Sequence, residues 1–205
     1  DSPATGTAFK QESWTPWRSV LKAAFAEPLN EDEHGLFEQL SGGRLPPSER
    51  VSELWVVAGR RAAKSHVAAL TAVYMAFWGS KEALSNLSVG ERGTISVLAV
   101  DRTQAKVVFG YICGILEADK TLKAQISRIN AESVELVNNV TIEIGTASFR
   151  QVRGRSLLCC ICDEIAFWRS DYSANPDREV IRAALPSLAS NRGLLIGISS
   201  PYAKS

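Results

Sequence analysis

The chain has 205 residues, of which 45% are hydrophobic and 22% charged, and this composition excludes a disordered chain and indicates a globular protein with one sizeable core. A formal net charge of +1 argues against a uniformly basic nucleic-acid-binding surface, although arginines cluster locally at residues 60–61 and 150–155. The longest apolar run, residues 67–78, is shorter than the roughly 20 residues that a bilayer-spanning helix requires, so we expect no membrane segment.

The N-terminal region, residues 1–50, is expected to form a helical arm that precedes the main part of the chain. Apolar residues recur at helical spacing over residues 14–26, and a second helix is predicted over residues 32–40. Three aromatic side chains of this arm are candidates to pack against a nucleotide base, although an aromatic at helical spacing is more often part of a core: Trp14, Trp17 and Phe37.

A phosphate-binding loop is predicted between a short apolar strand and a long apolar helix. The strand begins near Glu53 and breaks at Gly59, and Lys64 and Ser65 then begin a segment that has no Gly or Pro before Trp78. Backbone N–H groups of such a loop point at one spot, the helix dipole adds partial positive charge there, and a lysine adds a full charge. The Ser65 hydroxyl would complete the site by binding Mg²⁺. The alternative is an ordinary strand-turn-helix with a surface lysine.

Alanine occupies both glycine positions of the pattern G-x-x-x-x-G-K-[ST], at Ala58 and Ala63. Glycine at the second position adopts unusual dihedral angles and approaches a phosphate without a Cβ atom in the way. If Ala63 must take a left-handed conformation, we expect a strain of roughly 1–2 kcal/mol and about a tenfold loss of nucleotide affinity. Such a loss weakens a site without abolishing it.

Strands alternate with helices through most of the remaining chain, and this pattern predicts a mainly parallel sheet. The strand before the phosphate loop is expected to be central in that sheet, and a β-hairpin with one exposed face is predicted around Asn138 and Asn139. The fold class is therefore α/β, a P-loop NTPase-type three-layer sandwich with a β-hairpin insertion, over residues 51–205. Its predicted elements are a buried helix (64–78), a strand (94–100), a helix (102–118), the hairpin (133–145), a strand (157–162), a helix (178–185) and a strand (193–199).

Two adjacent acids, Asp163 and Glu164, follow the apolar strand 157–162. Open parallel sheets place ligands at the carboxyl ends of their strands, where the phosphate loop is also expected. Asp163 would then hold Mg²⁺, and Glu164 would orient and deprotonate the attacking water. The alternative is a strand that ends in a solvated acidic turn.

The three cysteines of that strand, Cys159, Cys160 and Cys162, lie in one apolar run. Because side chains alternate across a strand, we expect buried reduced thiols rather than a disulfide framework, and reduced thiols fit a cytosolic compartment.

Arginine is the third requirement of phosphoryl transfer, because charge on the transferred group must be neutralised. Arg60 lies inside the loop and could act in cis, whereas Arg153 precedes the acidic strand and could be offered to a neighbouring subunit. Such arginines could instead contact DNA phosphates or simply be solvated. Ser199 and Ser200 follow the last strand, where their hydroxyls could sense the γ-phosphate, although Ser-Ser-Pro is also a common strand-ending turn.

Taken in order, these motifs resemble those of the ATPase domain of large terminase subunits, the DNA-packaging motors of tailed bacteriophages. The loop is similar to the family's Gly-Arg-Arg-x-Gly-Lys-Ser loop, with Ala63 in place of its glycine. The acidic strand end is similar to the family's Asp-Glu-Ala-Ala-Phe. The residues that carry the resemblance are Ala58 to Ser65, Val152 to Gly154, Ile161 to Trp168 and Ile198 to Pro201.

The resemblance implies ATP hydrolysis that drives double-stranded DNA through a portal protein into a procapsid, with ATP and Mg²⁺ bound by each subunit of a homo-oligomeric ring. It also implies a small terminase subunit as partner, monomers in isolation, and a location in the host cytoplasm and transiently on the procapsid rather than in the virion. The lid and nuclease domains of a complete large terminase are expected outside this chain. The implied nucleotide-binding residues are Gly59, Arg60, Arg61, Ala62, Ala63, Lys64, Ser65, His66, Ser199 and Ser200; the metal ligands are Ser65 and Asp163; the catalytic residues are Glu164, Lys64, Arg153 and Arg60.

Two other functions remain open at this point. Ala63 is compatible with a scaffold that keeps the fold but binds or hydrolyses nucleotide weakly and serves protein or DNA contacts. Another DNA-dependent ATPase of the same fold, such as a helicase, would require a second motor domain. Loss of turnover on substitution of Lys64 or Glu164 distinguishes an ATPase from the scaffold.

Overall fold

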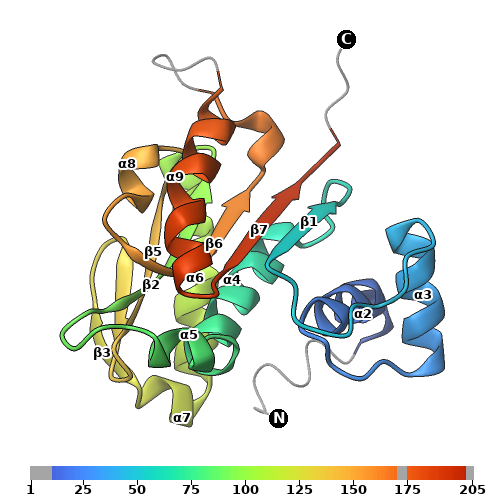
Figure 1. Ribbon diagram of the computed structural model, residues 1–205, viewed down its shortest axis with the longest axis horizontal. Coiled ribbons are helices and arrows are strands. Elements are labelled where there is room, and N and C mark those ends of the chain that lie inside the picture. The colour runs from blue at the N-terminus through green and yellow to red at the C-terminus, as the bar shows by residue number, and fades with distance from the viewer. Residues whose placement is uncertain (1–10, 170–174, 202–205) are drawn as a thin grey trace. The chain divides into compact units, whose positions relative to one another are not determined.

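The computed structural model describes residues 11–169 and 175–201, which form two compact units that divide after Ser52 (Figure 1). The first unit contains a short 3-10 helix (Glu12–Trp14), α2 (Thr15–Ala24) and α3 (Glu31–Ser41). α3 begins with a capping box, in which the Asn30 side chain accepts a hydrogen bond from the Glu33 N–H and the Glu33 side chain accepts one from the Asn30 N–H. Lys22 Nζ lies 2.6 Å from Glu33 Oε2, and this ion pair joins the two helices.

The second unit is built on a seven-stranded sheet with the strand order β1-β7-β6-β2-β5-β4-β3. β1, β7, β6, β2 and β5 run parallel, whereas β4 and β3 are antiparallel to their neighbours. The prediction of an α/β fold with a mainly parallel sheet is confirmed, and the predicted hairpin, β4 and β5, lies within this same sheet.

In chain order the elements are β1 (Glu53–Val57), α4 (Lys64–Tyr74), a π-helix (Met75–Gly79), α5 (Lys81–Ser85), β2 (Gly93–Ala99), α6 (Arg102–Ala118), α7 (Lys120–Lys123), β3 (Ile126–Ile129), β4 (Ser133–Leu136), β5 (Val140–Thr146), α8 (Phe149–Val152), β6 (Ser156–Asp163), a 3-10 helix (Ile165–Phe167), α9 (Pro176–Ser190) and β7 (Leu194–Ser199).

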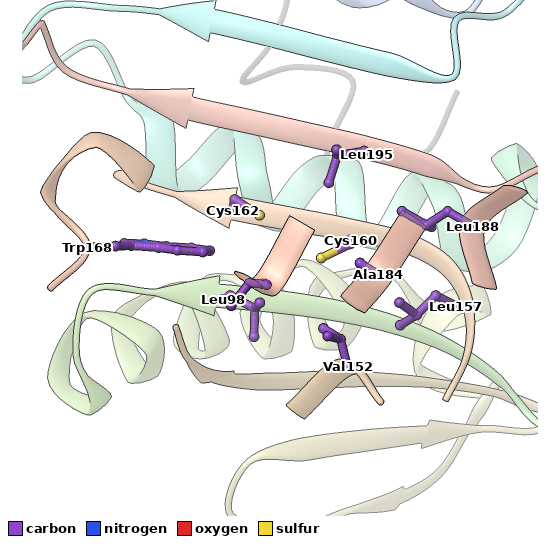
Figure 2. Packing of buried hydrophobic residues seen from close by; sticks show 10 residues of the cluster. Leu98, Val152, Leu157, Cys160, Cys162, Trp168, Ala184, Leu188 and Leu195 are labelled. Atoms are coloured by element: carbon purple, nitrogen blue, oxygen red, sulfur yellow. The ribbon is translucent and has the colours of Figure 1, made fainter. Parts of the chain in front are cut away.

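Helices cover both faces of the sheet and make three layers. α4 and α6 pack against each other on one face, and α8 and α9 lie over the other face (Figure 1). Figure 2 shows Cys160 and Cys162 of β6 in the apolar cluster that includes Ala184 of α9 and Trp168. Trp168 Nε1 donates a hydrogen bond to the Asp163 backbone oxygen at 3.0 Å, so the turn after β6 is tied to this core.

β6 is buried along nearly its whole length. Its residues from Leu157 to Asp163 are all buried, as the continuous apolar run predicts. The cysteines of this strand are free thiols. A strand that is packed on both faces gives the acids at its end a rigid base.

β1 lies at an edge of the sheet, so the prediction that it is central was wrong. Its burial alternates, and 50% of Trp55 and 73% of Val57 are exposed. An added Cβ at Gly197 of β7 would lie 2.3 Å from the Trp55 ring, so this ring covers the glycine of the neighbouring strand. The apolar sequence of β1 therefore reflects packing on β7 rather than burial on both sides.

Several element boundaries also differ from prediction. The helix predicted over 64–78 ends at Tyr74 and continues as the π-helix, where Asn138 Nδ2 donates to the Ala76 oxygen at 2.8 Å. α9 continues through Pro186 to Ser190 instead of ending at Leu185, and β3 had no alternating pattern long enough to predict it. α6 has the predicted bounds. In the part of the chain that the structure describes, no helix combines the length and apolarity needed to cross a membrane.

Candidate active site

The loop that joins β1 to α4 takes its shape from unusual backbone angles. Arg61 and Ala63 have φ angles of +62° and +57°, and Ala63 directly precedes the first residue of α4. This is the left-handed conformation that glycine adopts without steric cost. The Cβ atom of Ala63 therefore adds strain of roughly 1–2 kcal/mol to the loop.

Lys64 is the first residue of α4, and only 7% of it is exposed. Its Nζ donates to the backbone oxygens of Gly59 at 2.9 Å and Ala58 at 3.3 Å. The same ammonium lies 3.3 Å from Glu164 Oε1. The lysine thus links the loop to the acidic end of β6.

Asp163 ends β6 and is fully buried. Ser65 Oγ donates a hydrogen bond to Asp163 Oδ2 at 2.9 Å, whereas Oδ1 has no hydrogen-bond partner among the described residues. Burial raises the pKa of Asp163, and the charge of Glu164 adds to this effect, while the hydrogen bond from Ser65 opposes it. A buried carboxylate oxygen without a donor is ready to accept a cation or a water molecule.

Glu164 lies one residue further, at a φ angle of +52°, and this turn directs it away from the core. The carboxylate accepts hydrogen bonds from the Ser200 N–H at 2.7 Å and the Ser200 hydroxyl at 2.9 Å, with the Ser199 hydroxyl at 3.5 Å. Burial raises the pKa of Glu164, but the hydrogen bonds from Ser200 and the charge of Lys64 outweigh burial and hold the pKa below its usual value. The surroundings of the two adjacent acids therefore shift their pKa values in opposite directions, upward for Asp163 and downward for Glu164.

β7 lies between the two halves of this site. Val57 of β1 pairs in register with Ser199, and Asp163 of β6 pairs with Ile198. The Ala58 N–H donates to the Ser199 oxygen at 2.9 Å, which fixes the start of the loop to the end of β7. Six of the predicted residues consequently meet at the carboxyl ends of three adjacent strands: Lys64, Ser65, Asp163, Glu164, Ser199 and Ser200.

Other predicted residues lie at the margin of this group. Arg60 and Arg61 are exposed on the loop, and Gly59 and Ala62 flank these two arginines in the sequence. His66 follows Ser65 on α4, and its ring centroid is 4.9 Å from that of Tyr111 on α6. These residues therefore lie on the loop or in the first turn of α4, next to the residues that contact the acids.

Arg153 lies apart from the loop. Its guanidinium carbon is 4.6 Å from the centroid of the Phe149 ring, and it follows α8, which leads from β5 to β6. Arg153 lies three residues before Ser156, the first residue of β6, and so near the amino end of that strand, whereas the loop lies at the carboxyl ends; the eight residues of β6 span about 23 Å at ~3.3 Å per residue. An arginine side chain does not span that distance, so the geometry argues against Arg153 reaching a phosphate held by its own loop.

Sequence reasoning missed Gln104. Gln104 Nε2 donates a hydrogen bond to Ser65 Oγ at 3.1 Å, from the first turn of α6. A polar residue just beyond the carboxyl end of a strand next to β6 was the available signal, because β2 ends at Ala99 and pairs with β6. The adjacency of β2 and β6 was not evident from the sequence.

The chain was compared with known proteins. No protein-family model matches it, and no curated protein matches it significantly. The solved large terminase of bacteriophage HK97 matches with 16% identity and a TM-score of 0.56, over 90% of this chain and 37% of that one. The large terminase ATPase domain of Thermus phage P74-26 matches with 20% identity and a TM-score of 0.51, over 82% of this chain and 70% of that one. A point mutant of that domain gives a TM-score of 0.50 at the same identity and coverage.

These identities are low, so the likeness concerns the fold. The chain has the fold of phage large terminase ATPase domains, and the resemblance indicated by its motifs is confirmed at that level. The chain corresponds to little more than a third of the HK97 protein, at 37% of its length.

Proposed function

We propose that this chain is the ATP-hydrolysing domain of a phage DNA-packaging motor, with its active site where Lys64, Asp163 and Glu164 meet. The observation that carries the proposal is the convergence of distant residues. Lys64 lies 3.3 Å from Glu164, and Ser65 lies 2.9 Å from Asp163 although 98 positions separate them in the chain. The solved structures with this fold, described as phage large terminases and a terminase ATPase domain, support the same function.

The loop and Lys64 would bind the phosphates. The first turn of α4 offers backbone N–H groups and the positive end of a helix dipole, and Lys64 adds a full charge. Residues Gly59 to His66 form this cradle. Lys64 Nζ already lies beside the loop, within hydrogen-bond distance of the Gly59 and Ala58 oxygens.

Ser65 and Asp163 fit a Mg²⁺ ion. Asp163 Oδ1 is a buried oxygen without a hydrogen-bond partner among the described residues, and carboxylate and hydroxyl oxygens are suitable ligands for this hard cation. When bound, Mg²⁺ neutralises charge on the β- and γ-phosphates.

Glu164 would orient and deprotonate the attacking water. Lys64 and Ser200 now hold its pKa low, which makes it a weak base. A phosphate that attracts the Lys64 ammonium would remove one of these influences and raise the basicity of Glu164. Nucleotide binding would then prepare the base, while Ser199 and Ser200 would connect its state to β7.

An arginine from another subunit would complete the site. Arg153 is exposed and too far from its own loop, so it suits action in trans within a homo-oligomeric ring; Arg60 is the candidate in cis. The partners of such a motor are double-stranded DNA, a portal protein and a small terminase subunit. It would work in the host cytoplasm, docked transiently on a procapsid, with residues 1–50 as an arm before the ATPase core.

One observation favours a second function. Ala63 strains the loop, so the fold could serve as a scaffold that binds nucleotide weakly. In that case the unaltered chain would show neither appreciable ATP binding nor turnover.

The test compares ATP turnover and ATP binding in the unaltered chain with those of Lys64→Ala and Glu164→Gln at high protein concentration. We expect a loss of at least about 100-fold in turnover for each variant, since charge stabilisation and general-base catalysis typically contribute that much. Glu164→Gln should still bind ATP, whereas Lys64→Ala should bind it weakly. Lys106→Ala and Glu117→Gln, both exposed on α6, are matched controls that should keep full activity. Full turnover in Lys64→Ala and Glu164→Gln would rule out the proposal.

A further inference from the structure

Gln104 connects α6 to the candidate metal ligands. It is the third residue of α6, and its N–H is held by the Asp101 side chain that caps the helix, at 2.8 Å. Its side-chain Nε2 donates to Ser65 Oγ at 3.1 Å. The amide also lies close enough to Asp163 to lower the pKa of that carboxyl group, against the larger effect of burial, which raises it. One amide group thus interacts with both residues that would hold Mg²⁺.

The hydrogen bonds of Ser65 fix the direction of its hydroxyl group. A serine hydroxyl has one proton and two lone pairs. The proton is donated to Asp163 Oδ2 at 2.9 Å, and one lone pair accepts from Gln104. One lone pair remains. Within the described ranges, this lone pair and Asp163 Oδ1, which has no hydrogen-bond partner there, are the oxygen acceptors that the two residues offer to a cation.

We propose that Gln104 is a positioning residue that presets Ser65 and Asp163 for Mg²⁺, an inference that rests on the proposed function. Without the amide, the Ser65 hydroxyl keeps only its hydrogen bond to Asp163 Oδ2, so the direction of its lone pairs is less tightly fixed. Residues that hold metal ligands from behind typically contribute about 10- to 100-fold to metal affinity. Gln104 also ties the metal site to α6, which packs against α4, so both helices take part in presenting the ligands.

The test measures binding of a fluorescent ATP analogue as Mg²⁺ is titrated, and again in EDTA, for the unaltered chain, Gln104→Ala and Gln104→Met. Methionine keeps most of the side-chain volume but has no N–H donor. In both variants we expect the Mg²⁺ concentration that gives half of the maximal change in analogue binding to rise by about tenfold or more. Affinity for the analogue in EDTA should not change, because Lys64 and the loop are intact. Thr103→Ala, exposed on the same turn of α6, is the matched control.

Each outcome separates the two proposals. Unchanged Mg²⁺ dependence in both variants would overturn the role of Gln104 while leaving the ATPase proposal intact. A defect in Gln104→Ala that Gln104→Met restores would show that the side chain acts by packing alone, which also overturns it. If the unaltered chain binds no analogue with or without Mg²⁺, the proposed function itself fails.

Discussion

The loop before α4 and the carboxyl end of β6 meet at one edge of the sheet, yet they are held in place by different means. The loop depends on its backbone: Arg61 and Ala63 have positive φ angles, and the strand that leads into it, β1, lies at the sheet edge. The acids depend on side-chain hydrogen bonds and on β6, which is buried along its length. The loop therefore carries strain that a substitution can relieve, whereas a substitution at the acidic end can only remove a hydrogen bond or a charge.

Substitution of Arg153 tests whether the loop and the acids are sufficient for ATP hydrolysis without an arginine from another subunit. Arg153→Ala should reduce ATP turnover by about 10³-fold under conditions that favour assembly, because an arginine supplied in trans is worth that much or more. Turnover per subunit should rise with protein concentration in the unaltered chain and stay flat in the variant.

Arg150→Ala is the matched control for Arg153→Ala. Arg150 lies on α8 beside the same Phe149 ring, at 5.9 Å, and should keep the concentration dependence. If instead Arg60→Ala removes activity at every concentration, the loop supplies the arginine itself and no neighbour is needed.

A smaller effect is expected from relieving the loop. Ala63→Gly removes a left-handed strain of roughly 1–2 kcal/mol but adds roughly 0.4–1 kcal/mol of unfolded-chain entropy. The free energy of unfolding, measured in urea, should therefore rise by about 0.5–1 kcal/mol, because the strain is already present in the loop without nucleotide. Ala62→Gly, at a neighbouring position without a positive φ angle, should lower stability instead. Equal effects of the two substitutions would contradict strain at residue 63.

A small change in the pH dependence of folding stability is expected from Asp163 at the end of β6. The pKa of Asp163 is raised by burial, so the protonated form favours the folded state, and this contribution is lost as pH rises through the folded-state pKa. Asp163→Asn resembles the protonated form at every pH. In EDTA, it should be more stable than the unaltered chain at neutral and alkaline pH, and the difference should vanish as pH falls below the ordinary aspartate pKa of about 3.9. A pH-independent difference would mean that the charge of Asp163 is not the cause.

Much of this arrangement follows from the sequence for identifiable reasons. The run from Leu157 to Cys162 has no polar residue, so it had to be buried on both faces, and the acids had to emerge at its end. The rule that parallel strands share one carboxyl edge then placed Lys64, Ser65, Asp163 and Glu164 at the same edge, whereas their pairing depends on strand order.

Two features were beyond sequence reasoning. Strand order depends on long-range pairing that no local pattern encodes, so the edge position of β1 and the place of Gln104 beside Ser65 were missed. The apolar sequence of β1 could not distinguish an edge strand from a central strand. Trp55 is apolar because its ring packs over Gly197 of β7, not because β1 is buried on both faces.

The place of β7 has a mechanical consequence. It is bonded on one side to the strand that leads into the loop and on the other to the strand that carries the acids, and its end supplies Ser199 and Ser200. A sliding displacement of β7 along its axis would therefore shift the loop before α4 and reorient Glu164 at the same time. Any force on this one strand would reach both halves of the candidate site together.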